Sequence, residues 1–277
     1  MILSIIVILA GALTILFLLY TKWCTHLYDF WIAILVFLVC FIISLIFVNL
    51  TIYLLTLTIN KKKKYTEKSK FWRLTVKYYC QFLIQILRID INFRGLENIP
   101  DDKTFVLVQN HNSLFDPVIT IWLLRYLDIV FLMKKEIDKV PFLSHALYRL
   151  DFPALDRNNN REGLKTIIKT TKMIEEGKHS VGVYPEGTRS KDGKIHEFKA
   201  GSFKIPERCG CPIVVTVLKG TDKLMKNFPF KKTNVYFDCI ACIDSKDYQG
   251  ENTPELSDTV YKMMVERLDE LNEMEKE

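Results

Sequence analysis

Uncharged apolar residues dominate the first 60 positions, where Lys22 and Asp29 are the only formal charges. At about 1.5 Å per residue, the 20-residue run Met1–Tyr20 reaches about 30 Å, the thickness of a bilayer core. The run Phe30–Ile59 is longer than one perpendicular span, so it must tilt, kink near Asn49 or continue into the headgroup region. This pattern predicts a membrane anchor with two transmembrane helices.

The sequence around these runs indicates how the anchor is oriented. A cleaved signal peptide is the alternative for residues 1–24, but no basic residue precedes the apolar run and no small-x-small cleavage site follows it. The four lysines at 61–64 follow the second run, and basic clusters beside a span stay on the cytoplasmic side. We therefore expect an integral membrane protein whose following domain faces the cytoplasm, with the connection 21–29 on the opposite side.

Residues 61–90 form a basic juxtamembrane segment that contains an amphipathic run. Between Phe71 and Ile89 the polar residues recur about every fourth position, which is helical spacing and leaves one broad apolar face. A helix of this kind either lies in the membrane interface or packs on the domain. The pattern leaves both arrangements open.

Residues 91–277 alternate between strand-like and helix-like patterns. Short apolar or β-branched runs predict strands at Ile89–Phe93, Thr104–Val108, Ile129–Met133, Ser180–Tyr184, Pro212–Leu218 and Asn234–Ile243. Helical signals cover Pro117–Tyr126, Leu164–Glu176 and a segment that begins at Thr253-Pro254. This alternation predicts an α/β domain with a mainly parallel sheet flanked by helices.

Charge and cysteine content narrow the classes of partner. The net charge is +6, and the tail 251–277 carries nine acidic and three basic residues, so residues 61–250 hold a net charge of +12. A cationic domain beside a bilayer suits anionic lipids or phosphorylated substrates. Nucleic acid is the other partner of such charge, but the basic residues are scattered behind a membrane anchor, so we expect none. The odd number of cysteines, seven, argues against a disulfide framework. Cys209, Cys211, Cys239 and Cys242 fit buried thiols better than zinc ligands, so we expect no metal.

The first segment with catalytic potential is Asn110-His111-Asn112-Ser113-Leu114-Phe115-Asp116, between a predicted strand and a predicted helix. Asp116 is expected as the N-cap of that helix, with Pro117 at its first position. If Asp116 caps the helix, the loop before it can curl so that His111 contacts the carboxylate. A histidine held by an aspartate is a general base with a fixed tautomer. A simple cap beside an ordinary loop histidine is the alternative.

The second segment is Tyr184-Pro185-Glu186-Gly187-Thr188-Arg189-Ser190, at the end of a buried strand, where α/β folds place ligands. The spacing of Gly182 and Gly187 imitates a P-loop. However, Thr188 and Arg189 occupy the positions where that motif needs Lys and Ser or Thr, which disfavours nucleotide hydrolysis. The segment therefore offers backbone N–H groups, a carboxylate and a guanidinium suited to phosphate.

Taken together, the two segments resemble the first and third sequence blocks of the glycerolipid acyltransferase family, of the 1-acyl-sn-glycerol-3-phosphate acyltransferase type. Further similar segments follow in family order: Arg94–Pro100, Lys134–Glu136, Phe198–Phe203 and Lys219–Thr221. The resemblance covers roughly residues 88–225. It implies a glycerolipid acyltransferase-like α/β fold behind the anchor.

The resemblance also implies catalytic roles. His111 would deprotonate an acceptor hydroxyl, which attacks a fatty-acyl thioester, and Asp116 would orient the imidazole. The implied reaction transfers an acyl group from acyl-CoA or acyl-carrier-protein to the free hydroxyl of 1-acyl-glycerol-3-phosphate, that is, lysophosphatidic acid. The product would be phosphatidic acid, made for phospholipid biosynthesis without a cofactor.

By the same resemblance, Glu186, Gly187, Thr188 and Arg189 would bind the acceptor's phosphate and glycerol region. The second family block is matched in part by Asp151–Arg157, where Asp151 and Ala154 replace the family's Gly and Phe; Arg157 is retained as a second phosphate ligand. Candidate further phosphate contacts are Lys134 and Lys135, with solvated surface positions as the alternative.

Three other functions remain open at this stage. The acceptor could be glycerol-3-phosphate or another lysophospholipid. The protein could bind anionic lipid without turnover, although an intact His111 and Asp116 argue against that. A membrane-tethered hydrolase using the same pair on water is the third.

Overall fold

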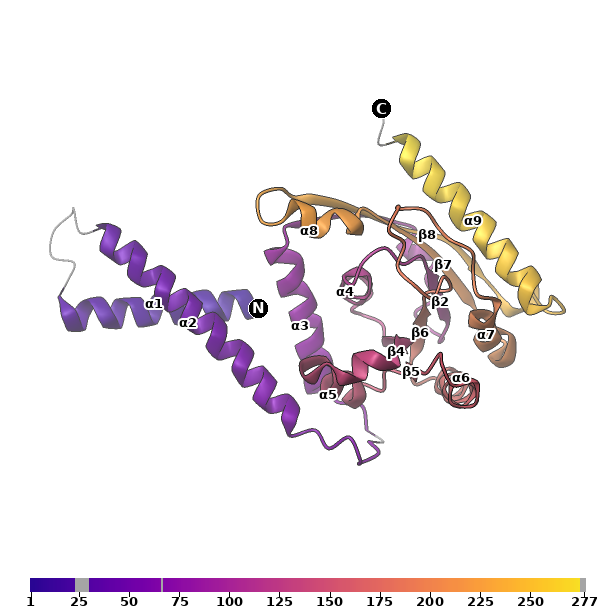
Figure 1. Ribbon diagram of the computed structural model, residues 1–277, viewed down its shortest axis with the longest axis horizontal. Coiled ribbons are helices and arrows are strands. Elements are labelled where there is room, and N and C mark those ends of the chain that lie inside the picture. The colour runs from indigo at the N-terminus through magenta and orange to yellow at the C-terminus, as the bar shows by residue number, and fades with distance from the viewer. Residues whose placement is uncertain (23–29, 66, 275–277) are drawn as a thin grey trace.

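The computed structural model describes residues 1–22, 30–65 and 67–274, apart from the side chain of Phe142. Two apolar helices, α1 (Ile2–Thr21) and α2 (Phe30–Leu57), lie together on one side of the domain (Figure 1). Both are long and apolar enough to cross a membrane. Helix α2 continues without interruption through Asn49, whose Nδ2 donates to the Leu45 carbonyl oxygen at 2.7 Å. Residues 23–29 of the predicted connection lie outside the described residues.

Helix α3 (Lys70–Ile86) lies between the apolar helices and the domain (Figure 1). It begins at the N-cap Ser69, whose hydroxyl accepts from the Trp72 amide at 3.3 Å. Its apolar side packs on α1, where Phe82 joins a buried cluster with Ile2 and Ile6. The helix also packs on α4 (Asp116–Leu123) of the domain, whereas its contact with the membrane interface stays a prediction.

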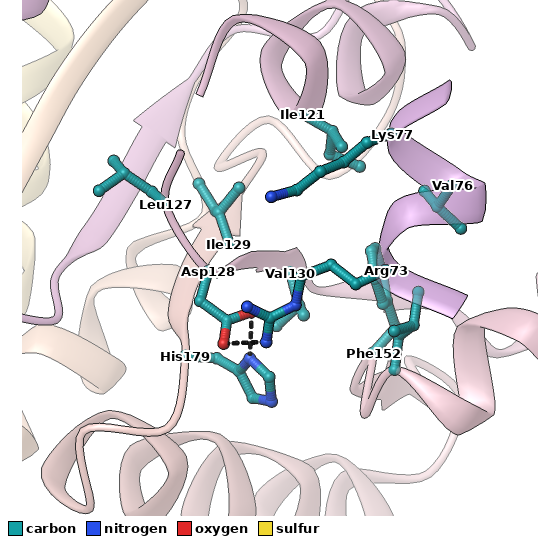
Figure 2. A pocket seen from close by; sticks show the side chains of 11 residues that line it. Arg73, Val76, Lys77, Ile121, Leu127, Asp128, Ile129, Val130, Phe152 and His179 are labelled. Carbon is teal, nitrogen blue, oxygen red and sulfur yellow. Dashed lines mark hydrogen bonds and ion pairs between the residues drawn. The ribbon is translucent and has the colours of Figure 1, made fainter. Parts of the chain in front are cut away.

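A partly buried ion cluster attaches α3 to the domain. Asp128 pairs with Arg73, with Lys68 at 2.6 Å and with the Nδ1 of His179 at 3.1 Å. Burial opposes ionisation of Asp128, but the hydrogen bonds from His179 and Lys68 outweigh it and hold the pKa of this carboxyl well below its usual range. Figure 2 shows Arg73, Asp128 and His179 beside a cavity of about 30 Å³, room for about one water molecule. The cluster thus fixes α3, the helix next to α1 and α2, to the domain.

The domain is built on a six-stranded sheet in the described part of the chain, with strand order β1-β8-β7-β2-β6-β3. Its strands are β1 (Ile89–Arg94), β2 (Val106–Gln109), β3 (Ile129–Phe131), β6 (Ser180–Val183), β7 (Ile213–Lys219) and β8 (Thr233–Ile243). The β7–β8 pair is antiparallel and the other pairs are parallel. Every residue of β2, β6 and β7 is buried, as in sheets covered on both faces. The predicted α/β fold with a mainly parallel sheet is confirmed.

Helices cover both faces of this sheet. In Figure 1, α3 and α4 lie on the side of the apolar helices, and α7 and α9 lie on the other. The further helices are α4 (Asp116–Leu123), α5 (Pro141–Arg149), α6 (Asn160–Glu175), α7 (Lys204–Cys209), α8 (Leu224–Asn227) and α9 (Thr253–Met274). Short 3-10 turns are η2 (Leu96–Asn98), η3 (Lys135–Lys139), η4 (Ala200–Phe203), η5 (Thr221–Lys223) and η6 (Ser245–Asp247). The sequence did not predict α5, because nine residues hold too few turns to show a period.

One predicted strand is divided. The run Ile129–Met133 reads as a single strand, but β3 ends at Phe131, and Met133 begins β4 (Met133–Lys134), which pairs with β5 (Ala154–Leu155) in a separate two-stranded sheet. The Met133 amide donates to the Pro153 carbonyl at 2.9 Å. A continuous apolar run carries no signal for a change of partner, so the break was invisible in the sequence. The predicted domain boundaries at residues 60 and 90 stay predictions.

Candidate active site

The two predicted catalytic segments meet at the carboxyl ends of neighbouring strands. Strands β2 and β6 pair in parallel, with Val108 opposite Val183, so the segment after each strand emerges at the same edge of the sheet. His111 follows β2, and the turn from Tyr184 follows β6. This is the edge where open α/β sheets bind ligands. The cavity beside α3 is lined by other residues and is separate from this site.

His111 and Asp116 form a hydrogen-bonded pair. The Nδ1 of His111 lies 2.8 Å from Oδ2 of Asp116, which is completely buried. The same oxygen accepts from the amides of Asn112 at 2.7 Å and Ser113 at 2.8 Å. Since an ionised carboxylate only accepts hydrogen bonds, Nδ1 is assigned as the protonated nitrogen. Nε2 is then the nitrogen able to accept a proton.

The prediction that Asp116 meets His111 because it is the N-cap of the helix is wrong. The N-cap of α4 is Phe115, and Asp116 and Pro117 are the first two helical residues. Instead of capping the helix, the Asp116 carboxylate points back toward the preceding loop and closes it by accepting hydrogen bonds from the two backbone amides. Three donors in that loop outcompete the helix amides, and this is what brings His111 to the carboxylate.

Two amide side chains hold the same loop against β7. Asn110 accepts from the Leu218 amide at 2.7 Å and donates to the Leu218 carbonyl at 2.8 Å, while Asn112 donates to that carbonyl at 2.9 Å. Asn110 is only 1% exposed. The segment that carries His111 is thus fixed to β7.

An aromatic stack supports the imidazole. The His111 ring lies on the Tyr184 ring with centroids 4.1 Å apart and planes 18° apart, and Tyr184 lies on Phe131 at 5.3 Å and 15°. A Cβ on Gly182 would come within 2.3 Å of the Phe131 ring, so the stack requires glycine there. Burial raises the pKa of Tyr184 well above its ordinary value, which keeps the phenol neutral. Sequence reasoning missed Tyr184, although an aromatic residue directly before the Pro-Glu-Gly turn was a signal.

Glu186 lies behind His111. Its Oε1 accepts from the His111 amide at 2.8 Å and its Oε2 accepts from the His196 amide at 3.1 Å, and the residue is 4% exposed. Burial raises the pKa of this carboxyl, and the two backbone hydrogen bonds act in the opposite direction. The Ser190 amide donates to the His111 carbonyl at 2.7 Å. In this arrangement Glu186 joins three loop segments instead of facing solvent.

The turn after Glu186 presents cations and free amides. Gly187 has φ +74°, which favours glycine, and its carbonyl accepts from Arg157. Thr188 and Arg189 are exposed, and their amides donate to no group in the described residues. The Lys199 side chain approaches the same turn, because a Cβ on Gly187 would lie 3.1 Å from its Nζ. Lys199 was missed as a site residue, although it lies in a segment that carries the family resemblance.

Lys134 and Lys135 are placed differently. Both are exposed, and their ammonium groups face carboxylates: Lys134 lies 3.8 Å from Glu136 and Lys135 lies 2.8 Å from Asp156. Their suggested phosphate contact stays a prediction without support from these contacts. The structure therefore brings His111, Asp116, Glu186, the 187–189 turn and Arg157 together, but it does not bring the two lysines into the same network.

The region that contains the site matches a family of known proteins. The model of a family described as Acyltransferase matches residues 90–219, which span the strands β2 and β6 and both site segments. Among solved structures, the 1-acyl-sn-glycerophosphate (LPA) acyltransferase of Thermotoga maritima shares the fold, with a TM-score of 0.63 and 22% identity over 84% of this chain and 92% of that one.

Several curated relatives carry one name. A 1-acyl-sn-glycerol-3-phosphate acyltransferase of Borreliella burgdorferi is 30% identical over 186 residues, 65% of this chain and 72% of the relative. A chloroplastic protein of the same name from Arabidopsis thaliana is 34% identical over 136 residues but is covered over only 37% of its length. The Saccharomyces cerevisiae protein of that name is 25% identical over 72% of this chain. On these similarities, the chain belongs to the acyltransferase family that includes the 1-acyl-sn-glycerol-3-phosphate acyltransferases.

Proposed function

We propose that this protein transfers a fatty acyl group to the free hydroxyl of 1-acyl-glycerol-3-phosphate and so produces phosphatidic acid. The acyl donor is a thioester, either acyl-CoA or acyl-carrier-protein. The observation that carries the proposal is the His111–Asp116 pair, 2.8 Å apart, at the same sheet edge as the cationic turn after β6. The names of the relatives point to the same reaction.

The proposed chemistry needs a base but no protein nucleophile. Nε2 of His111 takes the proton of the acceptor hydroxyl as its oxygen attacks the thioester carbonyl. Asp116 stabilises the imidazolium that forms, through the Nδ1 bond. When the tetrahedral intermediate collapses, the C–S bond breaks and the imidazolium returns its proton to the departing thiolate. The stack on Tyr184 holds the ring in one orientation throughout.

The acceptor's phosphate binds at the turn 187–189. Arg189 is exposed and forms no ion pair within the described residues, so its guanidinium is available for bidentate contact. The amides of Thr188 and Arg189 add donors, and Arg157 adds a second guanidinium beside Gly187. Glu186 contributes indirectly, because it positions both the turn and the His111 backbone.

The location belongs to the proposal as well. Helices α1 and α2 cross the bilayer, and the lysines at 61–64, directly after α2, keep the domain on the cytoplasmic side. Lysophospholipid acceptors reside in the membrane, so an anchored domain meets its substrate at the bilayer surface. Membrane lipids are thus partners as well as substrates.

One assay tests the activity and its base together. Membranes containing the protein are incubated with lysophosphatidic acid and oleoyl-CoA, and phosphatidic acid is measured by mass spectrometry beside His111→Ala. Product that disappears in the variant is expected. No product with acyl-CoA, acyl-carrier-protein donors or other lysolipids would refute the proposal and favour a lipid-binding protein.

Two further arms separate the alternatives. Glycerol-3-phosphate in place of lysophosphatidic acid identifies the acceptor. Loss of acyl-CoA without any acceptor would identify a hydrolase.

A further inference from the structure

The connection between β7 and β8 carries an exposed apolar segment, residues 224–232. Phe230 is 85% exposed, Met225 is 62% exposed and Phe228 is 38% exposed. Large apolar side chains clustered in water usually mark a contact surface. Three exposed lysines accompany them: Lys226, Lys231 and Lys232. The segment therefore combines exposed apolar side chains with neighbouring positive charges.

This segment, the 224–232 loop, is held in place by specific contacts. Arg88 donates to the carbonyls of Pro229 at 3.3 Å and Phe230 at 3.0 Å. The Lys231 amide donates to the Asn227 carbonyl at 2.8 Å, which closes the loop on itself. The apolar tips are exposed because the backbone behind them is bonded in that position.

The loop lies where the apolar helices meet the domain. Arg88 follows Leu87, the C-cap of α3, and the last turn of that helix includes Ile86 in the cluster that packs on Ile2 at the start of α1. At the other end of α3, Trp72 packs with Ile59, just after α2. Both junctions between the helices and the domain are thus arranged along α3. In Figure 1 the loop between α8 and β8 lies on the side of the domain that faces the apolar helices, about level with the end of α1 nearest the domain.

We propose that the 224–232 loop is a second membrane contact, separate from α1 and α2, and that its partner is an anionic bilayer surface. Met225 and Phe230 enter the boundary between head groups and acyl chains, and the three lysines bind lipid phosphates. The proposal rests on the membrane insertion of α1 and α2 in the proposed function. It adds a contact on the catalytic domain itself, which would hold the domain at a fixed height and tilt over the bilayer.

Photocrosslinking in the full-length protein tests this. The photoreactive residue p-benzoylphenylalanine is placed at Phe230, in nanodiscs of phosphatidylcholine with about 30% phosphatidylglycerol, an anionic lipid. After irradiation, lipid adducts are quantified by mass spectrometry. Leu38, 51% exposed within α2, is the positive control. Leu164, 43% exposed on α6 across the domain from the apolar helices (Figure 1), is the matched negative control.

We expect about tenfold more lipid adduct at Phe230 than at Leu164, because only the loop reaches acyl chains. Replacing Lys226, Lys231 and Lys232 by Gln should lower the Phe230 adduct by about tenfold in anionic discs and leave it unchanged in pure phosphatidylcholine. Adduct at Leu38 with none above background at Phe230 would overturn the loop contact alone. Absence of adduct at both positions would overturn the membrane part of the proposed function too. Acyl transfer, assayed in parallel, reports separately on the active site.

Discussion

The contribution of Asp116 can be measured with Asp116→Asn. In the wild type one carboxylate oxygen accepts from the His111 ring and from two backbone amides. An asparagine oxygen at the same position can still accept from all three donors, but the side chain carries no negative charge. The imidazole then has no anion to stabilise its charged form.

The size of the effect follows from the short contact. With Nδ1 and Oδ2 2.8 Å apart, the charge centres of imidazolium and carboxylate lie about 4 Å apart, which corresponds to about 4 kcal/mol at an effective dielectric constant of 20. Since each 1.4 kcal/mol changes a rate about tenfold, kcat should fall by about 10³. The KM for lysophosphatidic acid should stay within about twofold, because Asp116 is buried away from the phosphate turn.

The assay is thiol release from oleoyl-CoA by the purified protein in nanodiscs, with lysophosphatidic acid varied. Asp192→Asn is the matched control: Asp192 also bonds a histidine, His196, at 2.9 Å, but both groups are about half exposed. That variant should keep activity within about threefold of wild type. The reasoning would be refuted if folded Asp116→Asn kept more than about a tenth of the wild-type kcat.

Three further predictions concern Glu186, Tyr184 and the ion cluster that attaches α3. Glu186→Gln should lower the unfolding free energy by about 1–3 kcal/mol in chemical denaturation, since one amide loses its acceptor. The pKa of Glu186 is raised in the folded protein, so the wild type should lose stability as the pH rises from the ordinary glutamate pKa through the raised one. The Gln variant should lack this dependence of stability on pH. Equal slopes of stability against pH in the two proteins would contradict the prediction. Tyr184→Leu should lower kcat about tenfold with KM little changed, whereas Tyr184→Phe, which keeps the stack, should stay near wild type. For His179, Asp128 and Asp151 raise the pKa against the opposing effect of burial. The stabilising effect of protonated His179 should be full below pH about 6.5 and be lost as the pH rises through the raised pKa. If the difference in melting temperature between wild type and His179→Gln stayed constant from acid to alkaline pH, this prediction would be wrong.

Features that depend on local pattern were predictable from the sequence. The uncharged runs predicted α1 and α2, because a chain in lipid must satisfy its own backbone hydrogen bonds as a helix. Buried apolar strands alternating with amphipathic helices predicted the mainly parallel sheet. Both site segments were found because each directly follows such a strand, and parallel strands bring their carboxyl ends to one edge.

Features that depend on which distant residues meet were decided only by the tertiary structure. Glu186 was expected at the substrate, but its carboxylate accepts from the amides of His111 and His196, which lie seventy-five and ten residues away along the chain, respectively. Tyr184 supports the imidazole only because β2, β3 and β6 lie side by side. The split of one predicted strand, and the ion cluster that fixes α3 through Asp128, likewise depend on partners far along the chain. Spacing along one chain specifies the faces of its elements, whereas the contacts between those faces arise only when the elements pack.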